Sequence, residues 1–175
     1  MQTTKKRVHL LITGGTIDSV FDAARDMVVV NDASTISGYL NGIIRPHFEL
    51  SQEVVTLRDS REITDNIRAE ILRSIEKCSS DYILVTHGTY TMAATAVFLQ
   101  KHLKSNSKRV ILTGSMLPLQ GFSPTDAPFN LGFAISSLFL AEPGVYLAMN
   151  GQLFLADESV KNVDAGRFEL AKIQG

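Results

Sequence analysis

Four short apolar runs constrain the fold of this chain more than any other feature of its sequence. They lie at residues 8–13, 82–86, 109–114 and 144–150, and each is rich in valine, isoleucine, leucine or tyrosine. Runs that are apolar on both faces are typical of parallel strands that helices cover on two sides. A weaker strand is predicted at 52–57.

Helical patterns lie between these runs. Isoleucine recurs at every fourth position over 67–75 after a polar Thr-Asp-Asn capping signal, and apolar residues repeat with helical spacing over 92–103. Asp126 followed by Pro128 predicts the start of a third helix, which ends near 142–144. Strand–helix alternation at this spacing implies right-handed crossovers between parallel strands.

The predicted fold class is therefore α/β, with a doubly wound, mainly parallel sheet in a Rossmann-like or flavodoxin-like three-layer domain. We expect residues 1–175 to form this single domain, since the length suits one core. Two segments are not assigned to the sheet. Residues 18–26 are polar and aperiodic, which favours a loop, and residues 157–175 show little core-forming pattern beyond a short strand or hairpin.

The composition argues against several classes of function. With 17 basic and 18 acidic residues the net charge is −1, and no basic block marks a nucleic-acid partner. Cys78 is the single cysteine and cannot form an intrachain disulfide, and no residues show metal-ligand spacing. The longest apolar stretch, 131–141, is well short of the roughly 20 residues that cross a bilayer. Without a signal-peptide pattern, we expect a cytoplasmic protein with no membrane partner.

Glycine and threonine follow two of the predicted strands, at the sheet edge where α/β proteins bind ligands. Thr-Gly-Gly-Thr-Ile occupies 13–17 and His-Gly-Thr-Tyr-Thr occupies 87–91. The first pattern is neither a dinucleotide fingerprint nor a P-loop, which argues against nucleotide binding. Thr16 is then either a nucleophile or an incidental part of a tight glycine turn. Thr89 is expected near a helix N-terminus, where free backbone N–H groups can stabilise a developing oxyanion. Alternatively, Thr89 caps the helix.

Two further side chains have alternative interpretations. His87 is better explained as a structural histidine than as a base, because nothing close to it in the sequence orients it. Lys161 is either a solvated surface lysine or a partly desolvated group that helps a threonine hydroxyl to lose its proton.

In order and approximate spacing, several motifs resemble the bacterial-type L-asparaginase family. They are TGGTI, THGT-TM, LTGSMLPL followed by DAPFNL, and AMNG before SVKN. The resemblance covers essentially the whole chain. In length the chain is similar to short members that consist of the amino-terminal domain alone.

This resemblance implies hydrolysis of the asparagine side-chain amide to aspartate and ammonia, without a cofactor. Thr16 matches the family's nucleophile, Thr89 the second threonine that acts on water or supports a proton relay, and Lys161 its lysine partner. The resemblance also implies a set of substrate-binding residues. They are Ser60, Tyr90 and Ser115, together with Gly15 and Gly88 from the loops that carry the two threonines. The partners implied are a small amide substrate and further copies of the chain, in a homodimer or homotetramer.

Two positions depart from the family pattern. Tyr90 stands where the family has an aspartate that receives the substrate's α-ammonium, and losing such a charge-assisted contact costs on the order of 1.5–3 kcal/mol. Short members of the family carry a tyrosine in the loop after the first strand. The nearest match in this chain is Phe21, which has no hydroxyl. One hypothesis is therefore a weakened or retuned amidohydrolase, for example one that acts on a substrate without an α-ammonium. The other is a ligand-binding or regulatory protein that has lost catalysis.

Overall fold

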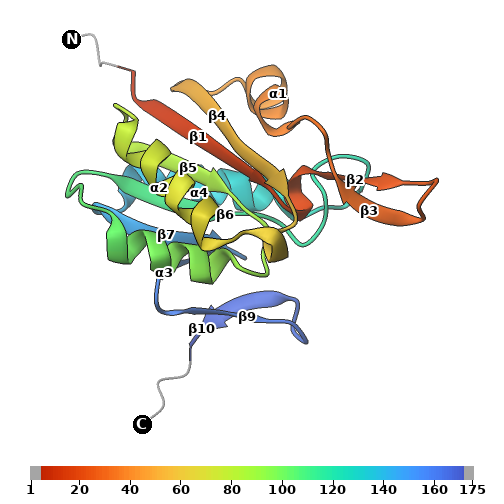
Figure 1. Cartoon of the computed structure of the whole chain (residues 1–175). Helices are drawn as coiled ribbons and strands as arrows, with labels where there is room; N and C mark the ends of the chain where they lie inside the picture. The colour runs from red at the N-terminus through yellow and green to blue at the C-terminus, as the bar shows by residue number, and fades with distance from the viewer. Residues whose placement is uncertain (1–4, 172–175) are drawn as a thin grey trace.

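Six strands form one sheet in the order β4–β1–β5–β6–β7–β8 (Figure 1). This computed structural model describes residues 5–171. The strands of this sheet are β1 Arg7–Gly14, β4 Glu49–Arg58, β5 Tyr82–Thr86, β6 Arg109–Thr113, β7 Gly144–Met149 and β8 Gln152–Leu155. The first five are parallel, as predicted from their apolar runs, and β8 is antiparallel to β7.

Helices cover both faces of this sheet and produce two cores. The helical elements are α1 Ile36–Tyr39, a π-helical turn at Leu40–Ile44, α2 Asp65–Lys77, α3 Met92–His102 and α4 Ala127–Leu140. Thr64 caps α2 by accepting the Ile67 N–H, and Asp126 precedes α4, so these two starts lie where the sequence predicts them.

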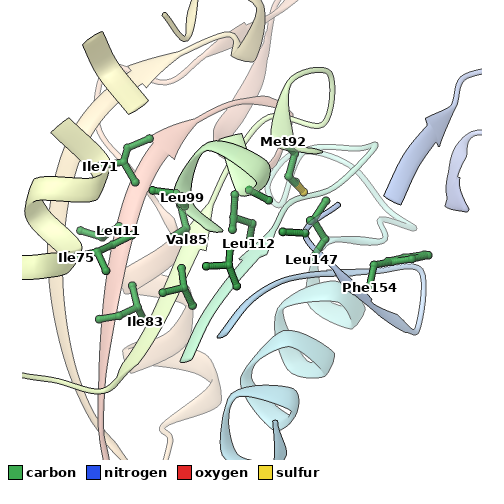
Figure 2. Close-up of a cluster of buried hydrophobic side chains, with 14 of the residues drawn as sticks. Leu11, Ile71, Ile75, Ile83, Val85, Met92, Leu99, Leu112, Leu147 and Phe154 are labelled. Carbon is green, nitrogen blue, oxygen red and sulfur yellow. The ribbon is translucent and has the colours of Figure 1, made fainter. Parts of the chain in front are cut away.

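Alternate residues of each strand enter different cores. Leu11, Val85 and Leu112 pack against α2 and α3, and Figure 2 shows them with Ile71 and Leu99 from those helices. The other face of the same strands packs against α1 and α4 in a second cluster of buried residues. This division confirms the three-layer α/β prediction.

The segment predicted as a loop at 18–26 is instead part of a hairpin. β2 (Ser19–Asp22) pairs antiparallel with β3 (Met27–Val30), and Asp22 Oδ1 accepts the Ala24 N–H at 2.9 Å in the turn. The loop prediction was wrong because the apolar strand that pairs with this polar segment lies just beyond it. Figure 1 shows the hairpin beyond the carboxyl ends of β1 and β4.

The carboxy-terminal hairpin was predicted more closely, up to the end of the described residues. β9 (Ser159–Asn162) pairs with β10 (Arg167–Leu170) and lies beside α3 (Figure 1). The prediction understated its packing, because Phe168 is only 3% exposed and belongs to the core that contains α2 and α3. Residues 172–175 of the predicted segment lie outside the described residues. No described helix has the length and apolar character needed to cross a membrane.

The strand order determines where a ligand crevice forms. In the sheet, β4 lies on one side of β1, and β5, the next strand of this sheet along the chain, lies on the other side of β1. In open α/β sheets such a reversal leaves a crevice outside the carboxyl ends of the two central strands. The Gly-Thr loops that follow β1 and β5 therefore both lie at this crevice.

Candidate active site

The loops after β1 and β5 are in contact through their glycines. Gly15 has φ 82°, and a Cβ added to it would come within 3.0 Å of Gly88 Cα and N, closer than real Cβ atoms come. A Cβ on Gly88 would in turn lie 2.6 Å from the Ser60 Cβ. Three stretches of chain therefore meet where only hydrogen atoms fit, and this fixes the two threonine loops against each other.

An irregularity in the β1–β4 pairing helps to bring Ser60 to this contact. Ile12 is the partner of Val54, whereas Gly14 is the partner of Arg58, so β4 contains two extra residues. The Arg58 carbonyl then accepts the Gly15 N–H at 2.8 Å. The short 3₁₀ turn Ser60–Glu62 follows directly and holds Ser60 against Gly88.

Thr16 lies half-buried at the start of the 3₁₀ turn Thr16–Asp18 and lines a cavity of about 280 Å³. The hydroxyl of Ser19, two residues after Ile17, donates to the Gly15 carbonyl at 2.9 Å and closes this turn. The other residues that line the cavity come from the β2–β3 hairpin, the segment after β4 and the segment after β6. They are Ser19, Val28, Val30, Asp59, Arg61, Met116, Leu117, Pro118 and Phe122.

Thr89 and Lys161 are joined directly although 72 residues separate them. Lys161 Nζ donates to Thr89 Oγ1 at 2.7 Å, and Thr89 is only 4% exposed. Lys161 is on β9, which reaches this loop because the hairpin packs beside α3. Burial, and then the positive charge of Arg61, lower the pKa of the Lys161 ammonium below its ordinary value. Its neutral form is therefore more accessible than that of a solvated lysine.

Tyr90 is 55% exposed, and two cations approach its ring. Lys161 Nζ lies 4.1 Å from the ring centroid, and the Arg61 guanidinium carbon lies 5.0 Å from it. The Tyr90 N–H donates to the Ser60 hydroxyl at 3.2 Å. Arg61 also forms a bidentate pair with Asp59, in which both hydrogen bonds are 2.9 Å long. Hydrogen bonding from Arg61 is the main cause that lowers the pKa of Asp59.

His87 is fully buried and its hydrogen bonds indicate its tautomer. Thr95 Oγ1 accepts from Arg68 Nε at 3.2 Å, so its own proton is directed at His87 Nε2, 3.0 Å away. Nδ1 then carries the ring proton and donates to the Gly88 carbonyl at 2.8 Å. Burial lowers the pKa of His87 to about 4, so the ring is neutral near pH 7. His87 supports the loop that carries Thr89.

Ser115 and Ser60 are buried and bonded to neighbouring chain. The Ser115 hydroxyl donates to the Leu117 carbonyl, and Asp126 accepts the Met116 and Leu117 N–H groups. The cavity wall is formed by the residues that follow Ser115 rather than by its hydroxyl. Ser60 likewise accepts from Tyr90, while its neighbours Asp59 and Arg61 line the cavity.

The structure thus brings Thr89, Lys161, Tyr90 and Ser60 into direct contact and joins Thr16 to them through the Gly15–Gly88 contact. The sequence interpretation did not single out Asp59 and Arg61, although both flank Ser60. It also did not single out the hairpin valines or the supporting pair Arg68 and Thr95. Phe21 pairs with Val28 in the hairpin and is 47% exposed. Within residues 5–171, no group of three His, Cys, Asp or Glu side chains is placed to hold a metal ion.

Comparison with known proteins adds independent findings. Residues 7–170 match the family profile described as asparaginase, N-terminal. The chain is 29% identical to a glutaminase-asparaginase from Acinetobacter glutaminasificans over 91% of this chain and 51% of that protein. It is 30% identical to L-asparaginase 2 from Escherichia coli K12, over 82% and 42% of the two chains.

A solved structure is also similar. A probable cytoplasmic L-asparaginase from Campylobacter jejuni superposes with a TM-score of 0.82 at 30% identity, over 95% of this chain and 53% of that one. The chain therefore spans about half the length of this protein and of the glutaminase-asparaginase.

Proposed function

Because this chain belongs to the family of asparaginase N-terminal domains, we propose that it is an amidohydrolase with a threonine nucleophile. In this proposal the Thr16 hydroxyl attacks the side-chain carboxamide of asparagine or of a closely related small molecule. The amide C–N bond breaks, the leaving nitrogen takes up the proton of the Thr16 hydroxyl and departs as ammonia, and an acyl ester of Thr16 remains. Water then hydrolyses the ester and regenerates the hydroxyl.

The observation that carries the proposal is the 2.7 Å hydrogen bond between Lys161 Nζ and Thr89 Oγ1. A hydroxyl is a weak nucleophile until a base removes its proton, and a lysine whose pKa is lowered is suited to that task. Burial and the charge of Arg61 both lower the pKa of Lys161. We assign the attack to Thr16 and the proton transfers to Thr89 with Lys161.

The other titratable groups near the loops support this assignment, because each is already engaged in other hydrogen bonds. His87 has both ring nitrogens hydrogen-bonded, to Gly88 and Thr95, and its side chain is fully buried. Asp59 is paired with Arg61, and its lowered pKa makes it a weak base.

A second candidate function is ligand binding without turnover. Tyr90 favours it, because a bulky neutral ring lies directly beside the Thr89–Lys161 pair. The homodimer or homotetramer expected from the family resemblance stays a prediction for either function. Light scattering on the purified chain measures it.

Ammonia release from asparagine, glutamine and a panel of small amides tests the proposal. We expect release by the wild-type chain to fall at least 1000-fold in Thr16→Ala and to persist in part in Thr16→Ser. Ser105→Ala is the control, because Ser105 also carries a hydroxyl but lies between α3 and β6, and it is not among the residues that line the cavity. We expect it to retain wild-type activity.

Two outcomes contradict the proposal. Unchanged release by Thr16→Ala would assign the nucleophile to another group. Absence of release from every amide, with calorimetric binding of aspartate or succinate intact, would favour the binding protein instead.

A further inference from the structure

The charges around Tyr90 point to a substrate class. Two cations, Lys161 and Arg61, approach the same ring, at 4.1 and 5.0 Å from its centroid. Arg61 also lines the cavity beside Thr16. Arg61 therefore connects the charged surroundings of Tyr90 with the cavity that the proposed nucleophile lines, whereas Lys161 and Tyr90 are not among the lining residues.

The negative side of the site is already neutralised. Asp59 is the carboxylate that lines this cavity, and Arg61 donates to it from Nε, from its second guanidinium nitrogen and from its backbone N–H. The same carboxylate acts on the other cation, since the negative charge of Asp59 raises the pKa of Lys161 against the lowering by burial and by Arg61. Two positive charges thus face one carboxylate, and that carboxylate is paired.

This balance discriminates between amides that differ in charge. An α-ammonium group would bring a third cation into the site, and among the residues that line the cavity it would find no carboxylate except the paired Asp59. A carboxylate would meet the charge of Lys161, which the Arg61–Asp59 pair leaves uncompensated, and the end of the Arg61 guanidinium that Asp59 does not engage. An anionic amide without an ammonium group therefore matches the site better than a zwitterionic amino acid amide.

The cavity walls suit the rest of such a molecule. Apolar surface of the cavity that Thr16 lines is provided by Val28, Val30, Met116, Pro118 and Phe122. Short methylene chains bury favourably against such surface. A molecule with a carboxamide at Thr16, methylene groups along these walls and a carboxylate toward Arg61 fits each part of the site.

We propose that the substrates are monoamides of short dicarboxylic acids that lack an α-ammonium group, and that Tyr90, between Arg61 and Lys161, is a specificity-determining residue. This inference rests on the proposed amidohydrolase function and names its substrate class. Succinamate and asparagine form a matched pair for the test, because they differ only in the amino group.

The experiment measures kcat/KM for ammonia release from succinamate and from L-asparagine. We expect the wild-type chain to prefer succinamate by roughly 10- to 100-fold, which is the range of one charge-assisted contact. Tyr90→Asp supplies a carboxylate beside both cations, and we expect it to shift the ratio toward asparagine at least tenfold. Tyr90→Phe keeps the ring, and we expect it to keep the ratio.

Arg61→Gln and a binding measurement give independent readouts. Arg61→Gln removes one of the two cations, so the preference for succinamate decreases several-fold. Calorimetry compares the products without turnover, and we expect succinate to bind the wild-type chain at least tenfold more tightly than L-aspartate.

The outcomes separate this inference from the function on which it rests. Thr16-dependent release that is equal for the two amides, or faster for asparagine, overturns the substrate class and leaves the amidohydrolase proposal intact. Absence of release from both amides overturns the function. In that event, tighter binding of L-aspartate than of succinate also overturns the charge argument.

Discussion

Replacing Gly15 by alanine tests the contact that joins the two threonine loops. An alanine at φ 82° and ψ −176° occupies a backbone region that is essentially confined to glycine, which costs about 1–3 kcal/mol. Its Cβ would also overlap the Gly88 backbone, and overpacking of this kind adds about 1–3 kcal/mol. We expect the free energy of unfolding to fall by about 2–6 kcal/mol in total.

Gly166→Ala is the matched control. Gly166 has φ 62°, but a Cβ there meets no atom within 4 Å, so only the backbone cost of about 1–2 kcal/mol applies. Urea unfolding of the two variants measures the difference, and at this chain length each kcal/mol also lowers the Tm by about 2–4 °C. Equal losses in both variants would refute the close contact of the loops. We also expect Gly15→Ala to lose ammonia release at temperatures where it remains folded.

Three further predictions concern His87, Lys161 and Phe168. Since the pKa of His87 is about 4 in the folded chain and about 6.5 when unfolded, the unfolded state gains the proton first, and about 3 kcal/mol of stability is lost as the pH falls from 6.5 to 4. Urea titrations against pH should show this slope in the wild type, and an equal slope in His87→Gln would contradict it. Lys161→Met should lower ammonia release at least 100-fold while changing the unfolding midpoint little, and a loss of stability instead of activity would count against its proton-transfer role. Phe168→Ala should cost about 3–5 kcal/mol by urea unfolding, whereas a cost below 1 kcal/mol would place the β9–β10 hairpin outside the core.

The strands of the central sheet could be predicted because each is a continuous apolar run buried on both faces. The same rule did not identify the β2–β3 hairpin, because Val20 and Phe21 are exposed and the partner strand Met27–Val30 lies outside the segment that contains them. The short helix α1 was also not predicted, since its four residues are too few to show a helical period.

For the candidate site too, some features could be predicted from the sequence and others could not. The positions of Thr16 and Thr89 follow from strand ends, because parallel strands bring their carboxyl ends to one edge. The Thr89–Lys161 hydrogen bond spans 72 residues, and no spacing rule predicts it. The placement of Arg61 depends on the extra residues in β4 and on the turn that follows, which only the three-dimensional pairing shows.

The central claim is that the Thr16 hydroxyl forms the acyl-enzyme. Rapid acid quench during turnover of succinamate or asparagine, followed by peptide mass spectrometry, tests it most directly. We predict an acyl ester on the peptide that contains Thr16 in the wild-type chain. Ammonia release with an unmodified Thr16 peptide, or with the acyl group on another residue, would contradict the account.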